Sequence, residues 1–272
     1  MRHWTTLLAA LLTLSSPGWV SAHEFWLRAE PLSPRVGTQV QMFMYFGEYF
    51  EGTQAGFQTS HAAVLRHYSD AGVDDLMGLV PSKEPIGQVP VDITRAGTHL
   101  VAFDSHTAQI TLPADKFQAY LHDEGLDRLV KQREEAGTAS QPGRERFRRH
   151  TKTLMRAAGK SDQTYAIRTG QRLEILPLND PLSQTAGATL NFKLLFDGKP
   201  LAGALLRAWH HHKQQTVSIR AKTDEDGNVS FALPYAGAWM ISTVHMIAAT
   251  DSSEVDWDSF WGSLMFEVPA RK

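Results

Sequence analysis

The sequence contains no cysteine in 272 residues. A disulfide framework and a thiolate metal site are therefore excluded. The formal net charge is only -2, so the overall charge does not favour nucleic acid or an anionic membrane surface as a partner. Histidine, in contrast, occurs 12 times. Any transition metal would have to be held by nitrogen, oxygen or methionine sulfur.

Recognisable catalytic motifs are also missing. The chain has no nucleophile elbow, no zinc-protease helix and no phosphate-binding loop. The sequence therefore favours a binding function over catalysis.

The first 22 residues have the pattern of a secretory signal peptide. An apolar stretch from Trp4 to Leu14 follows a short polar start, and Val20-Ser21-Ala22 supplies the small residues that a signal peptidase accepts. The apolar stretch is too short to span a bilayer. We therefore expect a periplasmic protein, without stable membrane insertion, whose processed form begins at His23.

Residues 23–113 have the pattern of a β-sandwich module. Val40, Met42 and Met44 alternate with other residues, which is typical of a strand with one buried face. Two further strands are predicted at 98–103 and 108–112.

Residues 114–160 change to a helical pattern. Apolar residues three and four positions apart predict two short amphipathic helices, one through Phe117, Tyr120 and Leu121 and one through Leu126, Leu129 and Val130. A third helix is expected at 144–156, with Phe147, Leu154 and Met155 on one side. The basic residues of its other side are expected to be solvated, namely Arg144, Arg146, Arg148, Arg149, Lys152 and Arg156.

Residues 161–272 return to a β pattern. Asp197-Gly198-Lys199-Pro200 predicts a turn, and the alternation from Val217 to Ala221 predicts a strand. The loop at 224–227 is expected to close a hairpin into a strand at 229–233, and a last strand is expected at 239–246. The predicted fold is mainly β, with two β-sandwich modules of an Ig-like or transthyretin-like kind and a short helical insertion between them.

Cleavage after Ala22 would give His23 a free α-amino group beside its own imidazole. The amine and Nδ1 of one histidine can close a chelate ring on a metal ion, which an internal histidine cannot do. Because the reference pKa of the amine is about 7.7–8.0, a metal can displace its proton near neutral pH. Such a site suits copper, nickel, cobalt or zinc.

Further ligands would come from elsewhere in the chain. His245 is the first candidate because it ends an apolar strand, where a polar side chain needs a partner. His99 is the next imidazole, and Glu48 could supply a carboxylate oxygen. Each also has an explanation without metal, as a core histidine bonded to backbone or as an ordinary polar residue at a strand end.

The tract His210-His211-His212 is expected at a hairpin end next to Lys213. Neighbouring residues of a strand point to opposite faces, so the three cannot form one facial set of ligands. A peripheral metal-binding role for the tract stays open. The remaining internal histidines are expected at the surface, namely His61, His67, His106, His122 and His150.

Several segments together carry a family resemblance. They are AHEFWL, FGEYFEG, KFQAYLHDEGLD, GKPLAGAL, the segment from TDEDGNV to TVHM, and VDWDSFWGSLMFEV. On these segments the chain resembles a bacterial domain-of-unknown-function family labelled as periplasmic components of cobalt/nickel-type ABC uptake systems. The resemblance implies an exported metal-handling protein, with the family's leading histidine at His23 and its late strand histidine at His245.

A second resemblance concerns only the last part of the chain. The run GKPLAGALLRAW, followed by TDEDGNVSFALPYAGAWMI, is similar to transthyretin-like and carboxypeptidase-regulatory-like sandwiches. It implies a fold and no activity.

We therefore expect a periplasmic protein that binds one divalent transition-metal ion (cobalt, nickel or copper) and passes it to a membrane transporter. Two alternatives stay open. A copper oxidoreductase acting on a polymer would need an exposed aromatic surface, which Trp26, Trp257 and Trp261 could supply unless they are buried in the core. A purely structural sandwich module would bind no stoichiometric metal.

Overall fold

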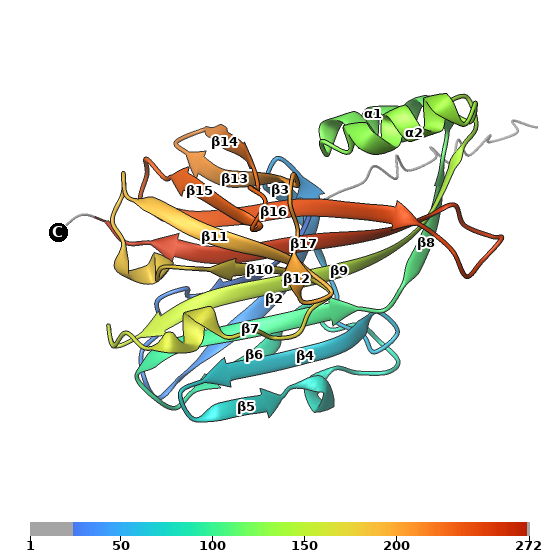
Figure 1. The fold of residues 1–272 in the computed structure, drawn as a ribbon. Coiled ribbons are helices and arrows are strands. Elements are labelled where there is room, and N and C mark those ends of the chain that lie inside the picture. Colours follow the sequence, from blue (N-terminus) through green and yellow to red (C-terminus); the bar gives the residue numbers. More distant parts are fainter. Residues whose placement is uncertain (1–23, 271–272) are drawn as a thin grey trace, which may run out of the picture.

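The computed structural model describes residues 24–270, which form three β-sheets and a pair of helices (Figure 1). The amino-terminal sheet has four strands, β1 (Glu24–Glu30), β2 (Thr38–Glu48), β3 (Glu51–Ala55) and β6 (Val89–Ile93). The carboxy-terminal sheet also has four, β10 (Leu173–Pro177), β11 (Thr189–Phe196), β12 (Lys199–Pro200) and β15 (Asn228–Ala232).

The central sheet has nine strands, in the order β14-β13-β16-β17-β9-β7-β4-β5 with β8 paired to β9. They are β4 (Ala62–Ser69), β5 (Gly72–Asp75), β7 (Gly97–Ser105), β8 (Ala108–Leu112), β9 (Gly143–Ala157), β13 (Leu205–His212), β14 (Gln215–Lys222), β16 (Gly237–Ala248) and β17 (Trp257–Val268). The α-helices are α1 (Ala114–Asp123) and α2 (Asp127–Glu135). Three 3-10 turns complete the chain, η1 (Met77–Leu79), η2 (Gln163–Ala166) and η3 (Pro181–Ser183).

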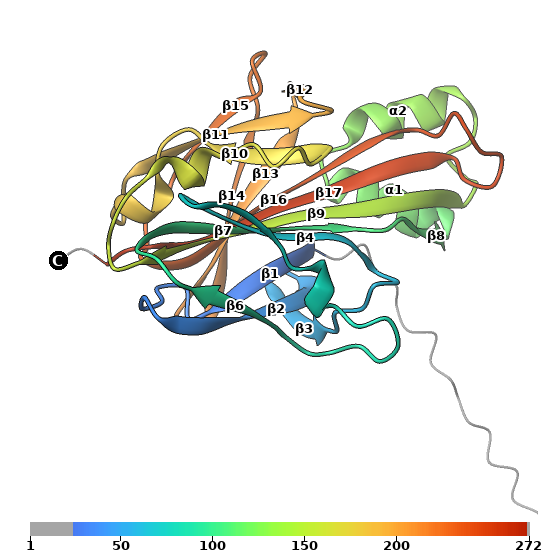
Figure 2. The ribbon, with the colours of Figure 1, turned by 90° about the horizontal axis from the view of Figure 1, so that it is seen from below.

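The two smaller sheets cover opposite faces of the central sheet. Leu100 and Ala102 of β7 pack with the carboxy-terminal sheet, whereas Val101 and Phe103 pack with the amino-terminal sheet. This alternation follows from the two-residue period of a strand. Figure 2 shows the resulting layers, with β10 and β11 on one side of the central strands and β1, β2 and β6 on the other. The predicted mainly-β, sandwich-like fold is confirmed.

The predicted third helix at 144–156 is wrong. This segment is strand β9, which lies between β7 and the parallel strand β17 in the middle of the central sheet. Several of its basic residues pair with carboxylates of other strands, whereas Arg148 is exposed. Lys152 is fully buried and donates a hydrogen bond to the buried Glu174 of β10 (3.2 Å), and Arg146 pairs with Asp258 of β17. Partners distant in the sequence thus override a local helical pattern.

The predicted hairpin around residues 224–227 is also wrong. The strands on its two sides are present, but β14 pairs with β13 in the central sheet and β15 pairs with β11 in the carboxy-terminal sheet. The loop therefore crosses between layers. A two-residue alternation predicts a strand but not its neighbour, because pairing depends on the rest of the sheet.

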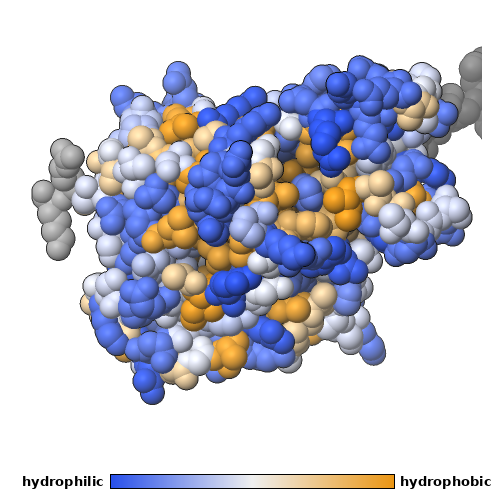
Figure 3. Space-filling view, in the orientation of Figure 1, coloured by the Kyte–Doolittle hydropathy of each residue, from blue (hydrophilic) through white to orange (hydrophobic). Residues whose placement is uncertain are grey.

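Helices α1 and α2 pack on the central sheet next to strands β8, β16 and β17 (Figure 1). Phe117 and Leu121 of α1 lie against Val244 of β16 and Trp261 of β17 in one apolar cluster. Figure 3 shows hydrophilic side chains over the outer surface of this helix pair. Within residues 24–270, no helix has the length and apolar character needed to cross a bilayer.

The predicted module boundaries at residues 113 and 160 stay predictions. The central sheet draws strands from all three predicted segments, since β7 precedes residue 113, β9 lies in the presumed insertion, and β16 follows residue 160. The signal peptide at 1–22 lies outside the described residues.

Candidate functional site

Strand β1 is fixed across the central sheet by three hydroxyl groups. The hydroxyl of Ser263 donates to the carbonyl of Phe25 (2.7 Å), and that of Thr153 donates to the carbonyl of Leu27 (2.7 Å). The amide of Leu27 donates to the hydroxyl of Thr151 (3.2 Å). Among the described strands β1 pairs with β2 alone. The backbone N–H and C=O groups on its other edge therefore need hydrogen-bond partners when this edge is buried. These bonds fix the position of Glu24 at the start of the strand.

Glu24 is a buried carboxyl group at the edge of a charged cluster. It is 9% exposed and directly follows His23 in the sequence. Burial and, after it, the charge of Glu124 raise the pKa of Glu24 to about 7, against the lowering effects of a backbone hydrogen bond and of Arg207. Glu48, at the end of β2, is a further charge that raises this pKa. We call Glu24, Glu48, Glu124 and Arg207 the β1 cluster.

Glu124 and Arg207 bring two distant segments to this cluster. Glu124 is the residue at the carboxyl end of α1, and Arg207 lies on β13. Nη1 of Arg207 donates a hydrogen bond to Oε2 of Glu124, and the two side chains are 4% and 11% exposed. Burial raises the pKa of Glu124, while Arg207 lowers it. Arg220 also lowers this pKa, so two guanidinium groups act on Glu124.

The turn between β2 and β3 is strained. Its two central residues, Tyr49 and Phe50, both have positive φ angles of 57° and 61°, where asparagine and glycine are the usual residues. Each left-handed residue of this kind costs about 1–2 kcal/mol. Packing offsets the cost, since Tyr49 contacts Trp209 edge-on and Phe50 packs against Trp26. The strained turn places Glu48 beside Glu24, and such strain is often found at functional sites.

A further buried carboxylate lies close by, under helix α1. Glu145 of β9 accepts hydrogen bonds from Tyr120 and Ser259, and its Oε2 has no hydrogen-bond partner among the described residues. Burial raises the pKa of Glu145 and lowers the pKa of its neighbour Arg149 to about 10. Because Glu124 and Glu145 both raise the pKa of Tyr120, this carboxylate adjoins the β1 cluster.

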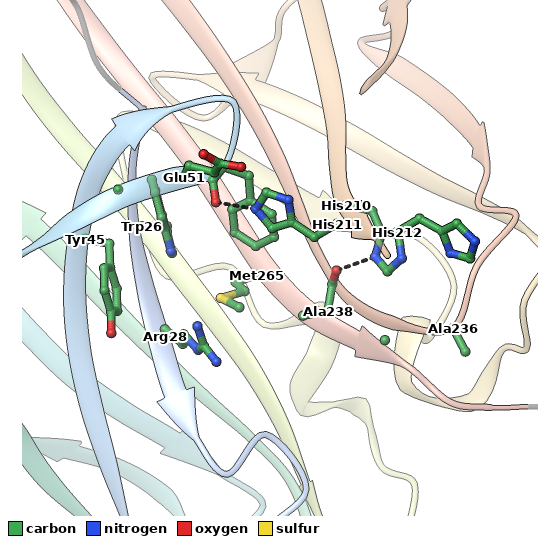
Figure 4. Close-up of a pocket in the computed structure, with 13 residues that line it drawn as sticks. Trp26, Arg28, Tyr45, Glu51, His210, His211, His212, Ala236, Ala238 and Met265 are labelled. Atoms are coloured by element: carbon green, nitrogen blue, oxygen red, sulfur yellow. Dashed lines mark hydrogen bonds between the residues drawn. The ribbon is translucent and has the colours of Figure 1, made fainter. Parts of the chain in front are cut away.

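An aromatic pocket of about 600 Å³ opens on the other side of Trp26. Trp26 and Tyr45 stack along one wall, with ring centroids 5.8 Å apart. Phe50 and His211 stack in parallel at 5.3 Å, and the Nε2 group of His211 donates to the carbonyl of Phe50 (2.8 Å). Figure 4 shows these rings together with His210 and His212, which continue the lining.

The sequence matches a family model described as a domain of unknown function, DUF4198, over residues 20–247. The chain belongs to the DUF4198 family. No curated protein matches the DUF4198 chain. The family description assigns no activity, so the uptake label and the transthyretin-like resemblance stay predictions.

Solved structures with similarity to this DUF4198 protein are distant. One is a tetra-tandem repeat in the extending region of a large adhesion protein, with 9% identity, a TM-score of 0.22, and coverage of 91% of this chain and 49% of that one. Another is an alpha-2-macroglobulin from Escherichia coli, with 10% identity, a TM-score of 0.23, and coverage of 89% and 23%. A Salmonella alpha-2-macroglobulin mutant has 8% identity, a TM-score of 0.20, and coverage of 89% and 15%. The chain spans less than half of each, and such TM-scores do not establish a shared fold.

The structure of the DUF4198 protein does not bring the two predicted imidazoles together. His99 of β7 is the cross-strand partner of Met155 on β9. His245 of β16 is the cross-strand partner of Phe260 on β17, which in turn pairs with Arg148 on β9. At about 3.3 Å per residue, the seven steps along β9 from Arg148 to Met155 separate the strand positions of the two histidines by roughly 23 Å. His245 and His99 therefore cannot bind the same ion, and Glu48 is left as the other possible third ligand.

Each of these histidines has its own surroundings. His99 is buried, with its Nδ1 2.8 Å from Nε2 of His67 and its Nε2 3.1 Å from the carbonyl of Arg95. His245 packs edge-on against Phe196 of the carboxy-terminal sheet, and burial followed by the charge of Arg128 lowers its pKa to about 4. It thus faces away from β1, which lies on the opposite side of the central sheet.

Of the four predicted ligands of the DUF4198 protein, Glu48 is the one found in the β1 cluster. His23 lies outside the described residues. Within residues 24–270, no group of three or more metal-binding side chains occurs. A site at this position therefore depends on His23.

Sequence reasoning missed Glu24, Glu124 and Arg207. The one signal for Glu24 is its place in the AHEFWL segment beside His23. Two of the histidines expected at the surface are buried, since His67 is 5% and His150 is 4% exposed. Trp26, Trp257 and Trp261 are buried as well, so they supply no exposed aromatic surface for binding a polymer.

Proposed function

We propose that this protein is an exported metal-binding protein that holds one divalent transition-metal ion at the start of β1. The amine and imidazole of His23 are the nitrogen ligands, and Glu48 supplies an oxygen ligand beside them. The ion is cargo, which the protein passes on to a membrane transporter. Cobalt, nickel and copper all suit such a mixed nitrogen and oxygen donor set.

The β1 cluster is the observation that supports this proposal. Glu124 and Glu48 both raise the pKa of Glu24, the residue that directly follows His23, and Arg207 lowers it. Arg207 and Arg220 lower the pKa of Glu124. A divalent cation would reduce the mutual repulsion of the carboxylates in this cluster. Burial of Glu24 and Glu124 also strengthens electrostatic attraction, because the effective dielectric constant is lower than in water.

A calorimetric titration tests the proposal. The processed form beginning at His23 is titrated with copper, nickel, cobalt and zinc, beside His23→Ala and Glu48→Gln variants. We expect His23→Ala to lower the number of bound ions by one, through loss of the ion at β1, and Glu48→Gln to weaken binding of that ion by about tenfold or more, at least the loss seen when outer-shell partners of metal sites are removed.

Glu51 provides a matched control. It is the cross-strand partner of Glu48 in the same hairpin, but it lines the aromatic pocket instead of the β1 cluster. Glu51→Gln removes the same charge and should leave the affinity within twofold of the original. Equal affinities for Glu48→Gln and the original protein would rule out Glu48 as a ligand.

A further inference from the structure

The three histidines at the end of β13 divide between the two faces of the strand. His210 and His212 lie on one face, with ring centroids 6.3 Å apart, and both stack on Tyr235. His211 lies on the other face and stacks on Phe50. Figure 4 shows His210 and His212 side by side next to Ala238, with His211 directed toward Glu51. Two imidazoles at positions i and i+2 of a strand can therefore approach a single ion.

His210 is oriented as metal-binding histidines are. Its Nδ1 lies 2.8 Å from the carbonyl oxygen of Ala238, which can only accept, so Nδ1 carries the proton and Nε2 keeps its lone pair. Metal-bound histidines usually donate their other N–H to such an acceptor. The ring stacks on Trp239 and on Tyr235, with ring centroids 4.6 Å and 5.5 Å away. Burial lowers the pKa of His210, which favours the neutral, metal-binding form.

His212 completes the pair from the last position of β13, next to the hairpin residue Lys213. Two imidazoles that share one ion through bonds of about 2.0–2.1 Å have ring centroids roughly 5–6 Å apart. The observed 6.3 Å is slightly wider, and the half-buried His212 ring at the hairpin end can close the difference by rotating about its χ angles.

His211 is engaged elsewhere through both ring nitrogens. Its Nε2 donates to the carbonyl of Phe50 (2.8 Å), so its Nδ1 accepts from the hydroxyl of Thr216 (3.2 Å). Neither nitrogen is available without breaking a hydrogen bond. The geometry therefore selects two of the three histidines.

We propose that His210 and His212 chelate a second divalent transition-metal ion through their ring nitrogens, at the rim of the aromatic pocket. Water completes the coordination, since the described residues contain no third metal-binding side chain at this place. Borderline ions such as copper, nickel and zinc suit a pair of imidazoles. This site uses no atom of His23 or Glu48, so it is independent of the site proposed at β1.

The test uses the full processed chain carrying His23→Ala, so that only the second site contributes. The protein is titrated with Zn²⁺ and Cu²⁺ salts, alone and with His210→Ala, His211→Ala or His212→Ala added. We expect one bound ion, a loss of affinity of more than about tenfold for His210→Ala and for His212→Ala, and a change of less than about twofold for His211→Ala. Electron paramagnetic resonance of the Cu²⁺ form should report two coordinated imidazole nitrogens, which also covers the case that His210→Ala fails to fold.

Three outcomes overturn the inference. They are the absence of binding in the His23→Ala protein, an equal loss of affinity with His211→Ala and His212→Ala, and a spectrum with fewer than two imidazole nitrogens. Equal losses would mean that a flexible histidine tract binds the ion without using the observed geometry. A protein with intact His23 that binds one ion, and loses that ion on His23→Ala, would refute this second site alone.

Discussion

Arg207 of β13 donates a hydrogen bond to the carboxylate of Glu124 at the end of helix α1. Both side chains are buried, so neither charge is well solvated by water. The same guanidinium lowers the pKa of Glu24. One ion pair thus joins the helical pair to the central sheet and sets the charge at the start of β1.

Replacing Arg207 by methionine should strongly destabilise the protein. The variant keeps the bulk of the side chain but leaves Glu124 without its charge partner, and breaking a buried pair typically costs about 3–5 kcal/mol. A double variant with Glu124→Leu removes both charges and should recover most of that loss. Urea unfolding at pH 7 measures the free energies. Equal stability of the single and double variants would contradict the importance of the pair.

Glu24 should make stability depend on pH in a defined direction. Its pKa is about 7 in the folded protein against 4.5 for an ordinary glutamate. The folded state therefore binds the proton more tightly, and this contribution to stability is present below pH 4.5 and lost as the pH rises through 7.

The Glu24→Gln variant tests that direction, because glutamine resembles the protonated acid and cannot ionise. At one pKa unit per 1.36 kcal/mol, it should be more stable than the original protein by about 3 kcal/mol at pH 8. At pH 4.5 the two should be nearly equal. Free energies of unfolding at both pH values decide the matter, and a difference that does not change with pH would refute the raised pKa.

The strained turn predicts opposite outcomes for its two aromatic residues. Tyr49 is 61% exposed, so Tyr49→Asn should change stability by less than about 1 kcal/mol, because relief of backbone strain offsets the lost contact with Trp209. Phe50 is 8% exposed, and Phe50→Asn should cost about 3–5 kcal/mol through lost packing. Thermal unfolding of both variants is the measurement. Similar destabilisation by the two changes would mean that strain is not relieved at Tyr49.

The elements that the sequence predicts correctly are those whose apolar pattern is formed by residues close together in the sequence. Val40, Met42 and Met44 alternate along β2, and the helical spacing through Phe117 and Leu121 gives α1. Strand β9 was not predictable in this way. Its Lys152 is fully buried only because Glu174, on another sheet, accepts its hydrogen bond.

The site shows the same limit. Glu48 was a candidate because it ends a strand in a distinctive segment, whereas the one local signal for Glu24 is its place beside His23, which does not show that its side chain is buried. Its burial and its raised pKa depend on Glu124 and Arg207, which the fold brings from α1 and β13. His245, in contrast, lies on a correctly predicted strand, yet the sequence did not reveal which face of the sheet it occupies.

His245→Phe should therefore leave metal binding unchanged. The side chain packs against Phe196 on the face of the central sheet opposite β1, and a phenyl ring can keep that contact. We expect an affinity within twofold of the original protein and a similar unfolding midpoint. Loss of stoichiometric binding in this variant would place the ion at His245 and refute the site at β1.

The most direct test of the proposed function changes one covalent bond. One alanine added before His23 in the processed protein converts the terminal amine into an amide, while every residue of the β1 cluster stays the same. Calorimetric titration with Cu²⁺ and Ni²⁺, in a His210→Ala/His212→Ala background that removes the second site, compares the two forms. We predict tight stoichiometric binding by the form beginning at His23 and its loss in the extended form. Equal affinity in both forms would contradict the proposed metal site.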